Sequence, residues 1–167
     1  MHIHYVIPAY RESKRLPGFL NQLLPQLQQS PLKLTVQIVD DGSGIDEQDL
    51  LSRFIISKQS DFPFLLPPIL NPVNQGKGTA VHSGWKSAPE CDLIGFVDAD
   101  GSISPQELLR FTELAIQQPG ACHFASRIKM MGRKIQRSEL RHYIGRIYAT
   151  LVGMSLKIPV YDSQCGL

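Results

Sequence analysis

Two aspartates, Asp98 and Asp100, are separated by a single residue and follow directly after a short apolar run at residues 93–97. A run of this length predicts a buried strand, which would place both carboxylates at the strand's carboxyl end. Open α/β sheets bind their ligands at that edge. Two carboxylates so close together repel unless a cation or a proton lies between them. A hard divalent ion such as Mg²⁺ or Mn²⁺, which prefers oxygen ligands and commonly also contacts substrate phosphates, suits this pair.

A simpler interpretation of the same residues is an acidic turn that contains Gly101 and holds no ligand. The pattern D-A-D-G alone leaves both interpretations open. Two more aspartates, Asp40 and Asp41, follow another apolar run at residues 34–39. Either carboxylate could accept hydrogen bonds from a nucleobase or a ribose, or could serve as a turn or helix-capping group.

Two common nucleotide-binding patterns do not occur. The first predicted turn has no G-x-G-x-x-G, which argues against a nicotinamide or flavin enzyme. The segment Gly76-Lys77-Gly78 lacks the spacer and the hydroxyl residue of a P-loop. Lys77 can still face a phosphate as a point charge, and the alternative is a solvated loop lysine.

The elements that must position these residues alternate between strand and helix. Strands are predicted at residues 3–7, 34–39, 93–97 and 121–126, with a short edge strand within 62–70, and helices at 16–28, 46–57, 79–88, 105–118 and 138–156. Pro25 predicts a kink or an early stop in the first helix. Leu50, Leu51 and Phe54 form the expected apolar face of the second. The alternation predicts an α/β fold whose Rossmann-like sheet is mostly parallel and has helices on both faces. Three strand ends then meet at one edge and carry residues 8–12, 40–41 and 98–100.

The composition is that of an ordinary globular domain. The chain has 167 residues, of which 43% are hydrophobic and 19% charged, and a net charge of +2. Three cysteines without metal-ligand spacing fit a reducing compartment. No run reaches the roughly 18 apolar residues of a membrane span, so we expect none here. Basic residues gather at 127–146, opposed only by Glu139, and the helix predicted at 138–156 could pack on the sheet or lie at a membrane interface.

Six segments occur in a fixed order: V-I-P-A-Y-R-E, I-V-D-D-G-S, N-Q-G-K-G, F-V-D-A-D-G-S, A-S-R and D-S-Q-C-G. Together they resemble the family 2 glycosyltransferases of GT-A fold, and within them the polyprenyl-phosphate branch that includes dolichyl-phosphate glucosyltransferases and mannosyltransferases. The resemblance covers nearly the whole chain. It implies that residues 1–167 form one catalytic domain. Because these relatives continue after the last motif, we expect the C-terminal part of the domain to be missing.

The resemblance also implies roles for individual residues. Asp98 and Asp100 would hold the Mg²⁺ or Mn²⁺ ion and the diphosphate of the sugar donor, with Ala99 packed beside them. Arg127 matches an arginine near the transferred or acceptor phosphate, and its alternative is an exposed arginine at a strand end. Arg11 stands where the family usually has Asn. The remaining implied positions line the nucleotide pocket, with Asp41 holding the base: Pro8, Tyr10, Glu12, Val39 and Asp41.

The implied reaction is the inverting transfer of a hexose, with UDP-glucose favoured as the nucleoside diphosphate sugar, to a polyprenyl phosphate. A lipid phosphate is largely anionic near neutral pH and needs positioning more than a base. If the acceptor is instead a sugar hydroxyl, a base is needed, and the candidate is Asp162, which could equally tie down a loop. A third alternative is a nucleotide-sugar-binding module without turnover.

The expected partners follow from this resemblance and from the distribution of charge. They are a nucleoside diphosphate sugar, a lipid phosphate acceptor and the cytoplasmic surface of a membrane, to which the basic segment would be attracted. Nucleic acid is not expected, because the basic residues lack the interleaved aromatics of an RNA-binding surface. We therefore expect a cytoplasmic protein that can also lie against the cytoplasmic face of a membrane.

Overall fold

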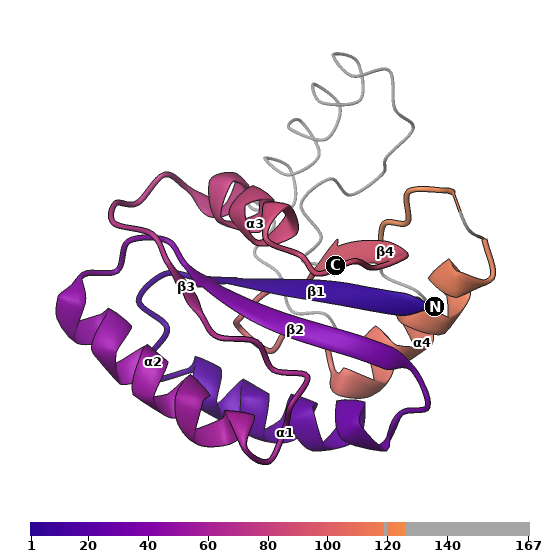
Figure 1. Ribbon diagram of the computed structural model, residues 1–167, viewed down its shortest axis with the longest axis horizontal. Coiled ribbons are helices and arrows are strands. Elements are labelled where there is room, and N and C mark those ends of the chain that lie inside the picture. The colour runs from indigo at the N-terminus through magenta and orange to yellow at the C-terminus, as the bar shows by residue number, and fades with distance from the viewer. Residues whose placement is uncertain (119, 126–167) are drawn as a thin grey trace, which may run out of the picture.

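A parallel sheet with helices on both faces forms the core of the computed structural model, which describes residues 1–118 and 120–125. The strands β1 (His2–Ala9), β2 (Lys33–Asp40), β3 (Ile69–Leu70) and β4 (Leu93–Phe96) pair in the order β3-β2-β1-β4, and every pairing is parallel. The helices are α1 (Leu16–Gln29), α2 (Ile45–Gln59), α3 (Lys77–Lys86) and α4 (Pro105–Ile116). The predicted fold class is confirmed, and the carboxyl ends of the strands share one edge (Figure 1).

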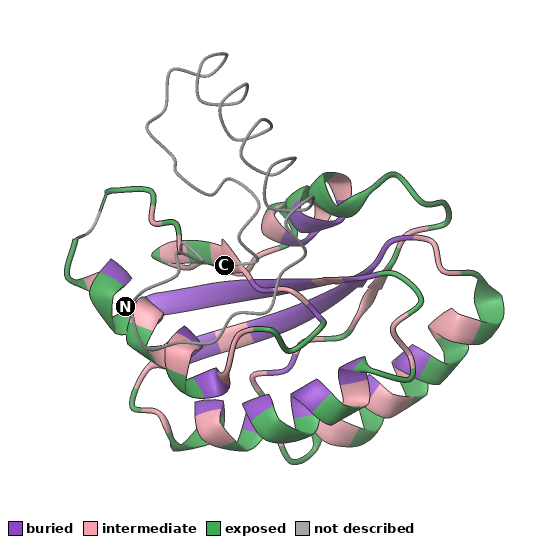
Figure 2. Ribbon diagram, turned by 180° about the vertical axis from the view of Figure 1, so that it is seen from behind, coloured by how far each residue is buried: buried purple, intermediate pink, exposed green. Residues whose placement is uncertain are grey.

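The two faces of the sheet are covered unequally. Helices α1, α2 and α4 lie on one face and α3 lies on the other (Figure 1). Alternate residues of β1 point to opposite faces, so that Ile3, Tyr5 and Ile7 join the larger core while Val6 packs with Ala80 of α3. Figure 2 shows the two long central strands almost entirely buried and each helix of the larger layer buried along one stripe.

Helix α1 does not stop at Pro25 but continues to Gln29. Its buried residues recur at helical spacing: Leu16, Phe19, Leu20, Leu23, Leu24 and Leu27. Pro25 lies on the exposed face, opposite this stripe. Proline removes one backbone hydrogen bond, but burial of the apolar stripe keeps the helix intact beyond Pro25.

Helix α4 begins with the capping box that the sequence predicts. The Ser104 hydroxyl accepts a hydrogen bond from the Glu107 backbone N–H at 3.3 Å, and the Glu107 carboxylate accepts one from the Ser104 backbone N–H at 3.3 Å. Pro105 follows at the first helical position, where a missing N–H costs nothing. This well-defined start fixes the length of the segment that carries Asp98 and Asp100.

Three predictions about local structure are wrong. Strand β4 is not the buried strand that was predicted, since Ile94 is 51% exposed and β4 lies at the edge of the sheet that the described residues form. In α2, Leu51 is buried and Phe54 packs against the larger core as expected, but Leu50 is 58% exposed and Ile55 is buried instead, because the helix is rotated relative to the expected apolar face. Residues 121–125 carry no strand. The helix predicted at 138–156 and the basic segment lie outside the described residues.

Among the residues that the structure describes, no helix combines the length and the apolar character needed to cross a bilayer.

A chain of hydrogen bonds joins two histidines at the edge of the sheet opposite the aspartates. His2 Nδ1 lies 2.8 Å from the Glu90 carbonyl oxygen, and the Thr35 hydroxyl lies 3.1 Å from His2 Nε2 and 3.0 Å from His4 Nδ1. A carbonyl only accepts, so His2 Nδ1 donates to Glu90. The Thr35 hydroxyl bridges His2 Nε2 and His4 Nδ1.

We predict that His4 makes the fold sensitive to acid. Burial, reinforced by the neighbouring His2, lowers the pKa of His4 below its usual 6.5, and the backbone of Gly84 opposes this shift in part. Below pH 6.5 the unfolded chain therefore binds more protons at this site than the folded chain. Stability should be fully present above that pH and should fall below it, by at most about 1.4 kcal/mol per pH unit. Urea unfolding between about pH 7.5 and 5.5 measures this, and His4→Gln should flatten the dependence. An equal slope in the variant would contradict the assignment.

The close packing of α3 on β1 predicts a second result. A Cβ added at Gly84 would lie 2.5 Å and 2.7 Å from the two Cγ atoms of Val6, which is fully buried. Gly84→Ala should therefore lower the free energy of unfolding by about 1–3 kcal/mol, although alanine favours a helix. Gly18→Ala in α1 is the matched control, because nothing lies within 4 Å of its added Cβ, and it should stabilise by about 0.5–1 kcal/mol. Equal effects of the two substitutions in urea unfolding would contradict the packing argument.

Candidate functional site

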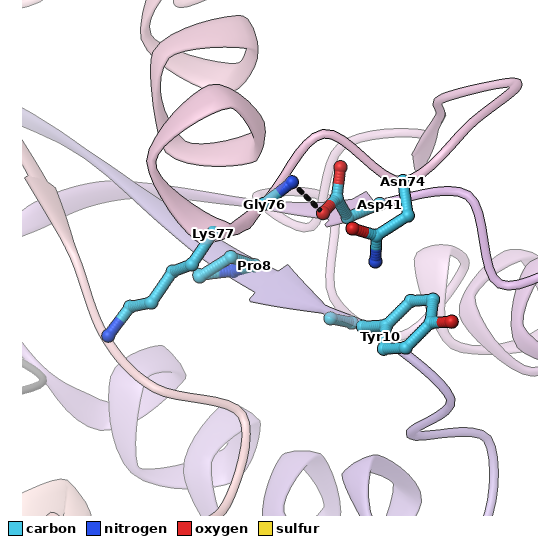
Figure 3. A pocket seen from close by; sticks show the side chains of 7 residues that line it. Pro8, Tyr10, Asp41, Asn74, Gly76 and Lys77 are labelled. Atoms are coloured by element: carbon cyan, nitrogen blue, oxygen red, sulfur yellow. Dashed lines mark hydrogen bonds between the residues drawn. The ribbon is translucent and has the colours of Figure 1, made fainter.

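A pocket of about 220 Å³ lies where the carboxyl ends of β1 and β2 meet the start of α3. Its lining combines residues from the end of β1, from the residue after β2 and from the segment that leads into α3: Pro8, Ala9, Tyr10, Asp41, Asn74, Gly76 and Lys77. Figure 3 shows Tyr10 and Lys77 extending in different directions from the residues around Asp41. The pocket therefore joins three segments that the sequence alone places far apart.

Asp41 connects β2 to the start of α3. The residue is only 3% exposed. Its two oxygens accept hydrogen bonds from the backbone N–H of Gln75 at 3.1 Å and from that of Gly76 at 2.7 Å, and Figure 3 shows the second of these bonds. A carboxylate at a helix N-terminus is stabilised by the helix dipole. Each oxygen keeps one lone pair, so this side chain both positions α3 and remains able to accept a hydrogen bond from a ligand.

Asp40, the preceding residue, has a different environment. The residue is 1% exposed. Its carboxylate accepts hydrogen bonds from the Ser43 backbone N–H at 2.9 Å, the Ser43 hydroxyl at 2.5 Å and the Gln48 amide at 2.8 Å. These three donors tie the end of β2 to the turn and helix that follow. Of the two aspartates, Asp41 is therefore the one that lines the pocket, while Asp40 is structural.

The Ser43 hydroxyl extends this arrangement to the turn after β1. Its oxygen accepts a hydrogen bond from the Arg11 backbone N–H at 2.8 Å. Arg11 has a φ of 56°, a left-handed conformation that asparagine adopts more readily than arginine. Its guanidinium carbon lies 5.2 Å from the centre of the Tyr10 ring. The buried Asp40 carboxylate thus helps to hold a strained turn beside the pocket.

Two residues of the implied nucleotide site, Glu12 and Val39, lie outside this pocket lining, and so does Ala99, which was expected beside the D-x-D pair. Arg15 donates to both oxygens of the Glu12 carboxylate, with distances of 2.8 Å and 2.5 Å. Val39 is fully buried against Val6 and Ala80. Ala99 is also buried and packs in the larger core. Of the predicted nucleotide residues, the pocket brings together Pro8, Tyr10 and Asp41.

Lys77 connects the pocket to the D-x-D pair. Its ammonium lies 2.5 Å from Oδ1 of Asp98 and 4.9 Å from the centre of the Phe96 ring. Asp100 is exposed, and its Oδ1 accepts a hydrogen bond from the Ser102 backbone N–H at 2.9 Å. The turn after β4 therefore holds one carboxylate against Lys77 and leaves the other facing solvent.

The chemistry of this pair fits a hard divalent ion. Both groups are carboxylates, the oxygen ligands that Mg²⁺ and Mn²⁺ prefer. The Lys77 ammonium already balances the charge of Asp98 in the way that a metal cation would. Within residues 1–118 and 120–125, no three His, Cys, Asp or Glu side chains gather as a complete metal cage. Such an ion commonly keeps waters and takes further ligands from substrate phosphates, so a site with two carboxylates would be completed by those ligands.

Sequence reasoning assigned no role to Asn74 and Gly76, which line the pocket, or to Ser43. The signal that could have found them is Gly42 in D-D-G-S. A Cβ there would lie 2.2 Å from the Val73 carbonyl carbon, so the turn after β2 packs directly on the backbone of the segment before α3. The candidates Arg127 and Asp162 lie outside the described residues, and their roles stay predictions.

The chain matches a family model and curated relatives. The model of the family described as Glycosyl transferase family 2 matches residues 5–166. A dolichyl-phosphate beta-glucosyltransferase of Trichomonas vaginalis is 28% identical over 99% of this chain and 52% of its own length. An undecaprenyl-phosphate 4-deoxy-4-formamido-L-arabinose transferase of Pseudomonas syringae is 33% identical over 69% of this chain and 33% of its own length. The chain thus spans about half of the first relative and a third of the second.

A solved structure shows the same fold. The crystal structure of residues 1-349 of TarS from S. aureus matches with a TM-score of 0.50 and 22% sequence identity, and it covers 70% of this chain and 33% of that chain. At this identity the likeness concerns the fold alone, which is GT-A.

The conformation of Arg11 leads to a prediction. Arg11→Asn should raise the free energy of unfolding by about 0.5 kcal/mol, because relief of the left-handed strain exceeds the loss of an exposed cation–aromatic contact. Lys14→Asn is the control, since it removes a positive charge from the same turn, where only Arg11 among the described non-glycine residues has positive φ. Urea unfolding measures both variants. A loss of stability in Arg11→Asn would mean that the guanidinium contributes more than the strain costs.

Proposed function

This chain is a member of glycosyl transferase family 2, and from that premise we propose that it transfers a hexose from a nucleoside diphosphate sugar to a polyprenyl phosphate. The observation that carries the proposal is the continuity of the site. Tyr10 and Asp41 line the same pocket as Lys77, and Lys77 contacts Asp98. An aromatic ring and a carboxylate suit a nucleobase, while a cation beside a D-x-D pair suits a diphosphate.

The base and the diphosphate would bind at opposite ends of this site. Uracil presents one imide N–H, for which a remaining lone pair of the Asp41 carboxylate is a suitable acceptor. Tyr10 is 42% exposed, and its ring offers a surface for stacking. Lys77 extends away from Asp41 toward the other end (Figure 3). The pocket thus suits uridine, and one relative is named a beta-glucosyltransferase, so UDP-glucose is the donor that we expect, with its sugar beyond Lys77.

Asp98 and Asp100 are the residues that would hold Mg²⁺ or Mn²⁺. Such an ion, when bound, neutralises the charge that develops on the leaving diphosphate. Asp98 is 25% exposed in its side chain, so its charge is only partly screened by water. Asp100 is held by the Ser102 N–H through one oxygen and has its second oxygen for a ligand.

The choice of acceptor rests on the relatives. Both curated proteins are named for transfer involving a polyprenyl phosphate, dolichyl in one and undecaprenyl in the other. An anionic phosphate oxygen would attack the anomeric carbon on the face opposite the diphosphate. The new C–O bond forms as the bond to the diphosphate breaks, and the nucleoside diphosphate leaves. No proton has to be removed, and Arg127 with its basic segment would position the acceptor at a cytoplasmic membrane face.

A transfer assay tests the proposal. The chain incubated with labelled UDP-glucose, Mn²⁺ and a polyprenyl phosphate in detergent should produce label that extracts into organic solvent. Asp100→Asn should reduce this product by at least about 100-fold, because the neutral amide keeps the turn but loses a metal ligand. Asp49→Asn, which changes an exposed carboxylate on α2, is the control and should have no effect.

Two results would contradict the proposal. Release of UDP without any labelled lipid would exclude the lipid phosphate as acceptor. Equal product from Asp100→Asn and the unchanged chain would remove the metal-binding role of Asp100, provided that both show the same thermal unfolding.

A further inference from the structure

The contact between Lys77 and Asp98 links two elements at the point where they enter the site. Lys77 is the first residue of α3, and Asp98 follows β4. Their side chains are 47% and 25% exposed. The same ammonium also lies over the Phe96 ring, which adds a cation–π attraction. Phe96 and Asp98, both at the end of β4, therefore hold the Lys77 ammonium beside the D-x-D pair.

We propose that Lys77 is an exchangeable counter-ion, which neutralises Asp98 in the ligand-free protein and moves to the donor's diphosphate when a divalent ion takes its place. This inference rests on the proposed function, since it requires a metal ion at Asp98 and Asp100. It gives Lys77 a role that the function alone does not contain. Through the exchange of Lys77, the metal ion and the diphosphate would bind together much better than either binds alone.

The position of Lys77 on its helix supports this exchange. A cation at the first residue of a helix is disfavoured by the helix dipole, and the first turn of α3 contains no acidic residue. The nearby anions come from other elements, Asp41 after β2 and Asp98 after β4. An anionic partner therefore stabilises the Lys77 cation at this position, and a diphosphate could replace Asp98 in that role.

The exchange does not require α3 to move. The other end of the helix is held to β4 by a hydrogen bond from the Trp85 indole N–H to the Gly95 carbonyl at 3.0 Å. Asp41 holds the first end through the N–H groups of Gln75 and Gly76. Only the flexible lysine side chain has to change partner, and partly exposed ion pairs are weak enough to be displaced.

A coupling between ligands follows from this competition. A metal ion that binds alone must displace the ammonium and leave it without an anion. A diphosphate that binds alone must draw the ammonium away and leave two neighbouring carboxylates without a cation. When both ligands bind, each removes the unfavourable consequence of the other, so each raises the affinity for the other by the same factor.

Lys77→Met tests the proposal, because methionine keeps the unbranched stem and removes the charge. Mn²⁺ binding, followed by electron paramagnetic resonance with and without UDP, should be at least about fivefold tighter in the variant when UDP is absent. The factor by which UDP tightens Mn²⁺ binding should fall at least about fivefold. Lys86→Met removes an exposed charge from the last turn of the same helix and should match the unchanged chain in both measurements.

Three outcomes would overturn the proposal, and they separate it from the proposed function. Unaltered Mn²⁺ affinity in Lys77→Met, with Mn²⁺ binding intact in the unchanged chain, would exclude the counter-ion and leave the metal site standing. No Mn²⁺ binding in any variant, with or without UDP, would remove both. Lys77→Arg keeps the cation and covers the case in which Lys77→Met does not fold. It should bind Mn²⁺ alone as weakly as the unchanged chain, and tighter binding would contradict the role of charge.

Discussion

The carboxylate of Asp41 holds the site together. It is almost fully buried, and its two oxygens bind the backbone of Gln75 and Gly76 at the start of α3. Charge-assisted bonds from a buried carboxylate to N–H groups at a helix N-terminus are strong. They fix where α3 begins. The position of Lys77 beside Asp98 and the packing of Gly84 on Val6 both depend on that start.

The adjacent aspartates divide two tasks because successive residues at a strand end point to opposite sides. Asp40 points to the side where Ser43 and Gln48 surround it, and through Ser43 it stabilises the turn that carries Arg11. Asp41 points to the side of α3 and the pocket. One residue thus supports the scaffold while its neighbour contributes to the site, although their side chains are chemically identical.

The sequence predicts the parts of this structure that depend on local pattern. Alternating strands and helices predict the parallel sheet, the spacing of leucines predicts α1, and Ser104 with Glu107 predicts the start of α4. The failures depend on tertiary contacts. Nothing local shows that the stripe of α1 outweighs Pro25, or that α2 is rotated so that Leu50 faces solvent. The choice between Asp40 and Asp41, and the pairing of Lys77 with Asp98, likewise require positions in space.

Gly42 gives the pocket an indirect vulnerability. The backbone of Val73 and Asn74 lies where any side chain at position 42 would begin, 2.2 Å and 2.3 Å from a Cβ. The segment that carries Asn74 and Gly76 can therefore pack this closely against the turn after β2 only because Gly42 has no Cβ. A single methyl group at position 42 would displace this pocket-lining segment, although no residue that lines the pocket would be substituted. Substitution of a residue that does not contact the ligand could then change which ligands this pocket binds.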